Sequence, residues 1–360
     1  MKHIFNIITV ITALSVTSCI KESEYVSEYD KDLKNNYEAF WNLVNEKYCF
    51  LGDNYGYCKM VGGEKLDWNK VKEEMMPKVE AAKTEEELLD IMGQSIDYLQ
   101  DGHVWIDTKF KHRGCFTFYN KAFPNEEKYP VNFINNLIRD KILDYPYMTR
   151  NRHLYGTITR GGKKFFYLHH AEFTRDLTKE DLEMFKPHID KADGFIYDIR
   201  TNLGGSAQLA FNIAGRFVKE KTLVGYQILK DGKGYNDMTE PSALYIVPSK
   251  DGYNWTDMKT VVLTNRDVYS TANMFASYMK EVPNATVIGG ITGGGGGDPS
   301  TYYLPNGWAF TLSARKMSLD VNKVHIEAGV QPDIEVNITD ADIANKVDTI
   351  LEKALEVLSE

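Results

Sequence analysis

Several features are scarce in this 360-residue sequence, and each scarcity narrows the class of protein. Acidic residues outnumber basic ones, 51 Asp and Glu against 42 Lys and Arg, which gives a formal net charge of −9. An acidic chain without a basic cluster argues against a nucleic-acid partner. Apart from the first residues, no apolar run reaches transmembrane length. The length is sufficient for one large α/β domain and a smaller one.

Cysteine is rare, and its spacing does not favour a metal site. The chain has four cysteines, with no Cys-x-x-Cys pair and no accompanying histidine cluster, so we expect no metal and no cofactor. Cys49 and Cys58 are the closest pair in sequence. Either a disulfide between them or free, mostly buried thiols at Cys49, Cys58 and Cys115 fits the pattern.

Glycine-rich segments are present, but none has the sequence of a nucleotide-binding loop. Gly204 and Gly205 follow a strand pattern without a subsequent Gly-Lys-Ser/Thr, and their spacing is wrong for a dinucleotide fingerprint. The glycine run at residues 293–297 is not followed by a helical pattern. We interpret it as a mobile loop near the site.

The first residues resemble a secretory signal. Lys2 and His3 precede an apolar core at residues 4–16, and small residues lead to Cys19. Residues 16–19 resemble the lipobox of bacterial lipoproteins, in which the cysteine is lipidated and becomes the N-terminus. An ordinary signal peptide that happens to contain a cysteine is the alternative.

We therefore predict a lipoprotein signal peptide over residues 1–18, a lipid-bearing Cys19, and a solvated acidic tether over residues 19–31. Ile20, rather than aspartate, follows the cysteine. By resemblance to lipoprotein sorting signals, this favours the outer membrane, so the expected location is the cell envelope, with the membrane as a partner through the lipid anchor.

Residues 32–100 have the apolar spacing of amphipathic helices. The segments 37–48, 68–82 and 85–99 repeat apolar residues at three and four positions, and Thr84 with Glu87 forms a plausible capping box. We predict a small helical N-terminal domain here.

The centre of the larger region is a strand–turn–helix–strand pattern at residues 260–289. A β-branched run at 260–264 predicts a buried strand, helical spacing follows Ser270, and residues 286–289 predict a second strand. Such a βαβ unit places Ser270 at the carboxyl end of a parallel strand, where open α/β sheets bind ligands. A helix N-cap is the alternative role for this serine.

Further patterns extend this core over residues 101–339. Helices are expected at 133–143, 178–188 and 206–218, and strands at 104–106, 116–119, 154–158, 164–168, 194–199, 308–312, 314–319 and at a short final strand ending at 336. His169 and His170 are adjacent on a strand and point to opposite faces, so we interpret both as structural. A C-terminal helix is predicted within residues 340–360.

Four separated segments together resemble one family. Residues 101–104, 197–205, 263–272 and 327–333, in this order, are similar to the S41 serine peptidases, which include tail-specific proteases, the tricorn protease core and retinoid-binding relatives. The resemblance covers roughly residues 31–336. It implies an α/β core of the ClpP–crotonase type with βαβ units.

The resemblance also implies roles for individual residues. Ser270 matches the nucleophile, His103 the histidine of the tricorn-like branch, and Glu327 the acid that supports it. Gly204 and Gly205, with the N–H of Thr271, match the oxyanion hole. This set is coherent, because a serine needs a neighbouring base and a carboxylate would orient the imidazole.

The sequence departs from the tail-specific proteases in two ways. They use a serine–lysine dyad, but no lysine occurs between Lys280 and Lys316, so Ser270, His103 and Glu327 form the complete set. No PDZ pattern is recognisable between His103 and Gly194. We predict a cell-envelope serine endopeptidase that hydrolyses unfolded proteins or peptides through a Ser-His-Glu triad. The alternative is a catalytically silent ligand- or peptide-binding lipoprotein on the same scaffold.

Overall fold

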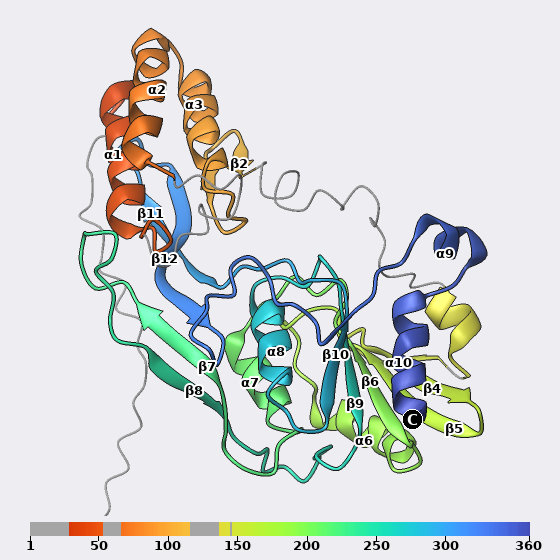
Figure 1. The fold of residues 1–360 in the computed structure, drawn as a ribbon. Helices are drawn as coiled ribbons and strands as arrows, with labels where there is room; N and C mark the ends of the chain where they lie inside the picture. The colour runs from red at the N-terminus through yellow and green to blue at the C-terminus, as the bar shows by residue number, and fades with distance from the viewer. Residues whose placement is uncertain (1–28, 53–65, 116–136, 145) are drawn as a thin grey trace, which may run out of the picture.

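Two β-sheets organise the protein (Figure 1). The computed structural model describes residues 29–52, 66–115, 137–144 and 146–360. The predicted signal peptide, the lipid site Cys19, most of the tether, Cys58 and the strand expected at 116–119 lie outside the described residues. Cys49 is a buried thiol.

The seven-stranded sheet contains the predicted βαβ unit. Its order is β13-β10-β9-β6-β5-β4-β3; the pairs from β13 to β5 are parallel, and β4 and β3 add antiparallel strands at one edge. The strands are β3 (Tyr147–Met148), β4 (Leu154–Arg160), β5 (Lys163–His169), β6 (Gly194–Asp198), β9 (Thr260–Thr264), β10 (Ala285–Gly289) and β13 (Ile334–Glu335).

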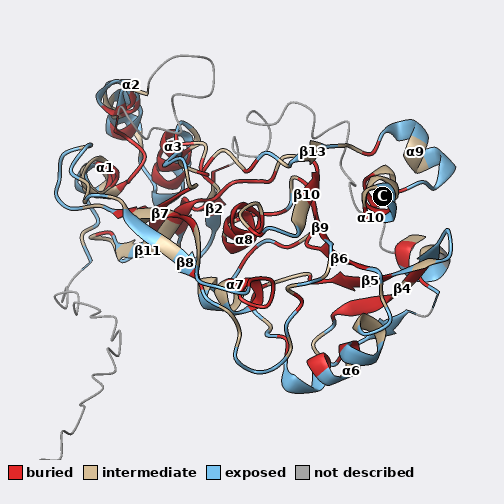
Figure 2. Ribbon diagram, turned by 60° about the horizontal axis from the view of Figure 1, so that its bottom comes forward, coloured by how far each residue is buried: buried red, intermediate tan, exposed pale blue. Residues whose placement is uncertain are grey.

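Helices cover both faces of this sheet, which explains why β6 and β9 are continuous apolar runs (Figure 2). Phe195 and Val262 point to the face covered by α6 (Lys179–Ile189), α7 (Ala207–Ala214) and α8 (Thr271–Met279). Their neighbours Ile196 and Val261 point to the opposite face, covered by α10 (Thr349–Ser359) and the π-helix η2 (Ile138–Ile142). Alternate residues of each strand thus enter two different cores.

The second sheet is antiparallel and carries the N-terminal helices. Its order is β2-β1-β12-β7-β8, and β11 also pairs with β12. The strands are β1 (Trp105–Asp107), β2 (His112–Gly114), β7 (Thr222–Leu229), β8 (Ser242–Ile246), β11 (Gly297–Tyr303) and β12 (Ala309–Leu319). The helices α1 (Leu33–Lys47), α2 (Trp68–Ala81) and α3 (Glu85–Asp97) share one hydrophobic core with β1 and β12.

This architecture confirms the predicted mixed α/β fold, the βαβ unit and the capping box of Thr84 and Glu87. Two predictions about elements are wrong. The two strands expected at 308–312 and 314–319 are one strand, β12 (Ala309–Leu319), rather than a pair. The C-terminal helix is two helices, α9 (Asp340–Asn345) and α10, because Lys346 takes the left-handed conformation at φ 58. Within the described residues, no helix has both the length and the apolarity needed to cross a membrane.

The shared core predicts that the N-terminal helices and the antiparallel sheet unfold together. Phe40 on α1 is fully buried, and its ring lies 5.0 Å from that of Phe310 on β12. We expect Phe40→Ala to lower the free energy of unfolding by about 3–5 kcal/mol. Denaturant unfolding followed by fluorescence and circular dichroism should give one coincident transition.

Phe110→Ala is the matched control, because Phe110 is 45% exposed and its truncation removes far less buried area. A separate, earlier transition of the helical signal in Phe40→Ala would contradict the shared core.

Candidate active site

Ser270 occupies a backbone conformation that favours glycine. It lies between β9 and α8 with φ 55 and ψ −124, and the carbonyl of Tyr269 accepts a hydrogen bond from the N–H of Ala272 at 3.0 Å. These angles are those of the first central residue of a type II′ turn, where glycine is preferred. Its side chain makes no capping hydrogen bond, so the alternative role as an N-cap is wrong.

The hydroxyl of Ser270 instead contacts the ring of His103. The distance from Ser270 Oγ to His103 Nε2 is 3.0 Å, so the structure brings these two residues together. His103 is 7% exposed, on the turn between α3 and β1. Burial lowers its pKa, although the carboxyls of Asp101 and Asp298 act in the opposite direction. The ring is therefore neutral near pH 7 and can accept the serine proton.

Glu327 forms no hydrogen bond with the His103 ring among the described residues. Its Oε2 accepts the N–H of Gly297 at 3.1 Å, while Glu327 Oε1 and His103 Nδ1 are both buried without a hydrogen-bond partner among the described residues. The predicted hydrogen bond between Glu327 and the second ring nitrogen is thus not formed. The backbone of Gly297 lies beside both groups, since it also acts on the pKa of His103. Burial raises the pKa of Glu327 well above its usual range, and the Asp101 carboxyl raises it further.

Asp101 is a residue of this site that the sequence analysis did not select. Its side chain is fully buried; Oδ1 accepts the backbone N–H of His103 at 2.7 Å, and Oδ2 accepts the hydroxyl of Ser313 on β12 at 2.7 Å. The carboxylate therefore fixes the histidine turn to the antiparallel sheet. The only sequence signal was its position in the Asp-Gly turn before His103.

The glycine run at residues 293–297 is not a mobile loop, which corrects our prediction. All five glycines are buried, and the carbonyl of Gly294 accepts the N–H of Ser270 at 2.8 Å. A Cβ on Gly294 would lie 1.8 Å from the carbonyl oxygen of Glu327, so only glycine allows this approach. The run is a packed connection between the Ser270 backbone and Glu327.

Residues 201–205 form a turn, here called the oxyanion turn, and its hydrogen bonds show which of the predicted backbone N–H groups are free to bind an oxyanion. The N–H of Gly204 donates to Asn202 Oδ1 at 2.9 Å, so Gly204 is not available as an oxyanion donor. The N–H groups of Gly205 and Thr271 have no hydrogen-bond partner within the described part of the chain. The Thr271 hydroxyl donates to the carbonyl of Gly205 at 2.7 Å and joins the two donor segments. Gly205 and Thr271 therefore remain as the pair that could stabilise an oxyanion.

His169 and His170, expected to be structural, both have partners inside the protein. His169 Nε2 lies 3.0 Å from the carbonyl oxygen of Arg200, and His170 Nδ1 lies 2.6 Å from the Tyr197 hydroxyl. Among the described residues, no group of three or more His, Cys, Asp or Glu is arranged to hold a metal ion.

A serine hydroxyl on a neutral histidine, with backbone donors at a helix start, is the arrangement of a serine hydrolase. The comparisons agree. The model of peptidase family S41 matches residues 164–336, and that of the tricorn protease C1 domain matches residues 29–97. A candidate peptidase from Parabacteroides merdae has a crystal structure with a TM-score of 0.80 and 33% identity, covering 91% of this chain and 97% of that one. The chain belongs to peptidase family S41, a family of serine peptidases.

More distant relatives are similar in part. The carboxyl-terminal-processing protease of Synechocystis is 27% identical over 205 residues, which is 56% of this chain and 45% of that protein. The chain spans about half the length of the curated relatives that it matches first. Mature CPAF, in complex with lactacystin, shares the fold at a TM-score of 0.67 and 12% identity, with 91% of this chain and 98% of that chain covered.

The close approach of the oxyanion turn to Ser270 predicts that Gly204 tolerates no side chain. Its φ is +106, and an added Cβ would lie 2.8 Å from Ser270 Cβ. We expect Gly204→Ala to lower the rate at which a fluorophosphonate labels Ser270 by about a hundredfold or more. The reason is that the added Cβ would displace the oxyanion donors, and the loss of one such donor lowers a reaction rate by about that factor.

Gly162→Ala is the control, since Gly162 has a similar positive φ of +82 but nothing within 4 Å of the added Cβ. It should show only the backbone strain, as a modest loss of thermal stability with normal labelling. Normal labelling of Gly204→Ala would contradict the close approach.

Proposed function

We propose that this protein is a cell-envelope serine endopeptidase that hydrolyses peptide bonds in unfolded proteins or peptides. The observation that carries the proposal is the 3.0 Å distance between Ser270 Oγ and His103 Nε2. A merely structural serine would not need the strained backbone that presents this hydroxyl to a base.

The chemistry is set by the roles of these groups. Ser270 Oγ attacks the scissile carbonyl carbon while His103 Nε2 takes the hydroxyl proton, and the N–H groups of Gly205 and Thr271 stabilise the oxyanion. His103 then gives the proton to the leaving amine. Water, deprotonated by the same histidine, hydrolyses the acyl-enzyme and restores Ser270. Glu327, which burial favours in its neutral form, would accept a hydrogen bond from the protonated ring without taking its proton.

The structure of the residues that follow the histidine turn supports unfolded proteins or peptides as the substrates. Residues 146–169 form β3, β4 and β5 of the main sheet, not a separate module. Among the described residues after the histidine turn, none forms a separate module for capturing substrate C-termini. We therefore propose internal cleavage of unfolded chains.

A reactive serine separates this proposal from the alternative of a silent binding protein. A fluorophosphonate probe should label the purified protein, Ser270→Ala should abolish labelling, and His103→Ala should reduce its rate by about a hundredfold or more. Glu327→Gln should reduce it less, because burial already favours the neutral acid, which glutamine resembles in shape. Gel fluorescence or intact mass measures each rate.

The pH dependence gives an independent check. Only neutral His103 can act as the base, and burial holds its pKa below the ordinary value of about 6.5. Labelling should therefore remain at pH 6.5 and fall on further acidification. A wild-type protein that takes up no probe at any pH, while binding an apolar ligand stoichiometrically, would favour the binding protein.

The location in the envelope is a separate proposal that rests on the sequence around Cys19. Cys19→Ala should leave the signal peptide uncleaved by lipoprotein processing, so the variant should be an unlipidated precursor that is larger than the mature wild type. Immunoblotting and intact mass measure both effects. A variant that is cleaved and migrates like wild type would refute the lipid anchor and leave the peptidase proposal intact.

A further inference from the structure

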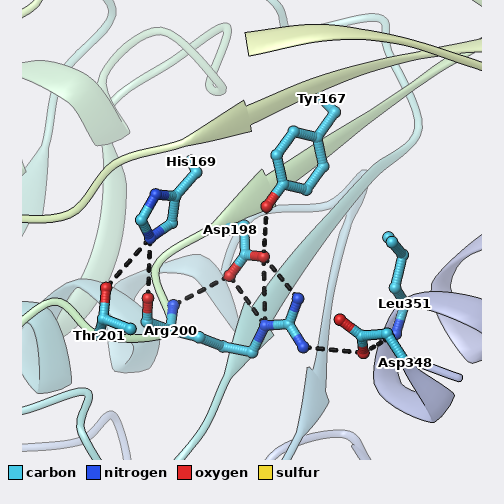
Figure 3. Close-up of polar contacts among 7 residues, drawn as sticks. All are labelled: Tyr167, His169, Asp198, Arg200, Thr201, Asp348 and Leu351. Carbon is cyan, nitrogen blue, oxygen red and sulfur yellow. Dashed lines mark hydrogen bonds and ion pairs between the residues drawn. The ribbon is translucent and has the colours of Figure 1, made fainter. Parts of the chain in front are cut away.

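A buried ion cluster lies directly before the oxyanion turn (Figure 3). Arg200 lies two residues after the end of β6 and is fully buried. Its guanidinium donates to both carboxylate oxygens of Asp198 at 2.7–3.1 Å. Nη1 of the same guanidinium donates to Asp348 Oδ1 at 2.9 Å. The hydroxyl of Tyr167 donates to Asp198 Oδ2 at 2.7 Å. One guanidinium thus joins two carboxylates in the interior.

Asp348 connects this cluster to the C-terminal helix. It is the N-cap of α10, and its Oδ1 accepts the N–H of Leu351 at 3.0 Å as well as Arg200. The buried face of α10, which includes Leu351 and Leu355, packs in one core with β9 and β10. The start of α10 is therefore fixed to the carboxyl end of β6.

The backbone that leaves Arg200 becomes the oxyanion turn. Thr201 has a φ of 82, and the carbonyl of Asn202 accepts the N–H of Tyr269, the neighbour of Ser270, at 3.1 Å. His169 Nε2 lies within 3.1 Å of both the Arg200 carbonyl oxygen and Thr201 Oγ1. A shift of Arg200 must therefore shift the turn, because side chain and main chain are held at the same point.

We propose that Asp348 is a positioning residue for the oxyanion turn, acting through Arg200, and that the start of the C-terminal helix is thereby a part of the catalytic apparatus. This inference rests on the proposed peptidase function. Asp348 is 1% exposed, so it acts through Arg200 and not on the substrate. Small displacements of donors matter, since a misplacement of about 1 Å can cost on the order of a hundredfold in rate.

Asp348→Asn tests the inference without leaving an uncompensated charge. The cluster has two carboxylates for one guanidinium, so the variant retains a balanced pair of Asp198 and Arg200. Asparagine also caps helices as well as aspartate does. The matched control is Glu352→Gln, which removes an exposed ion pair between the same helix and Arg160 on β4, at 2.8 Å, away from the turn.

With denatured, dye-labelled casein as the substrate probe, we expect Asp348→Asn to lower kcat about tenfold with little change in KM, a fraction of the roughly hundredfold cost of losing an oxyanion donor. A tripeptide aldehyde, whose adduct with Ser270 places an oxyanion in the turn, should bind about tenfold more weakly. The corresponding peptide alcohol should bind as it does to wild type. Glu352→Gln should retain wild-type kcat and aldehyde affinity.

Tyr167→Phe provides a second test that keeps every charge. It removes one hydrogen bond from Asp198 and should lower kcat and aldehyde affinity in the same direction, by a smaller factor. If Asp348→Asn does not fold, as judged by circular dichroism, this variant decides the question alone.

Failure of this inference and failure of the proposed function can be told apart. A wild-type protein that neither cleaves casein nor takes up a fluorophosphonate removes the peptidase function itself. An active wild type, with unchanged kcat and aldehyde affinity in folded Asp348→Asn and in Tyr167→Phe, overturns the positioning role and leaves the peptidase function standing.

Discussion

The strained backbone at Ser270 is the constraint on which the rest of the site depends. A non-glycine residue with φ 55 and ψ −124 costs on the order of 1–3 kcal/mol and persists only where the surroundings hold it. Three segments do so. The turn from Tyr269 to Ala272 closes by its own hydrogen bond, Gly294 accepts the serine N–H, and the oxyanion turn packs against the serine through Gly204. The glycines on both sides are needed because any Cβ would separate these segments.

Burial sets the charge state of the resting site. It lowers the pKa of His103 and raises that of Glu327, so both groups favour their neutral forms. Proton transfer from Ser270 would then create a positive ring in an environment where Asp101 and Asp298 already favour that charge. Because the low local dielectric strengthens such interactions, the carboxyls act most strongly when the imidazolium forms. His103 and Glu327 thus favour their neutral forms before the reaction, and the two aspartates partly offset the cost that burial adds to forming the imidazolium.

Sequence patterns predicted those elements of the fold that a local run of residues encodes. The continuous apolar runs of β6 and β9 and the capping box at Thr84 predicted their elements correctly. The strands β7 and β8 were missed, because they are partly exposed and show neither clean alternation nor a long apolar run. Glycine composition alone suggested mobility at residues 293–297, whereas the glycines there permit close backbone approach. That Asn202 occupies the N–H of Gly204 and that Asp101 holds His103 depends on tertiary contacts, which no local pattern encodes.

The contact between Ser270 and His103 is formed in the structure, but the contact between His103 and Glu327 is not. Ser270 and His103 are already in contact, whereas His103 Nδ1 and Glu327 Oε1 are each buried without a partner among the described residues. A buried polar atom without a partner costs about 1–3 kcal/mol, so closing this contact would be favourable if no other bond were lost. The N–H of Gly297 binds the other carboxylate oxygen of Glu327, and the backbone of the same residue raises the pKa of His103.

The same glycine ties the acid to the second sheet. Gly297 begins β11, and a Cβ added to it would lie 2.5 Å from the side chain of Ser313, the partner of Asp101. The antiparallel sheet therefore contacts both the aspartate that holds the histidine turn and the glycine that binds the acid. The precision of this site comes from the junction of the two sheets rather than from either sheet alone.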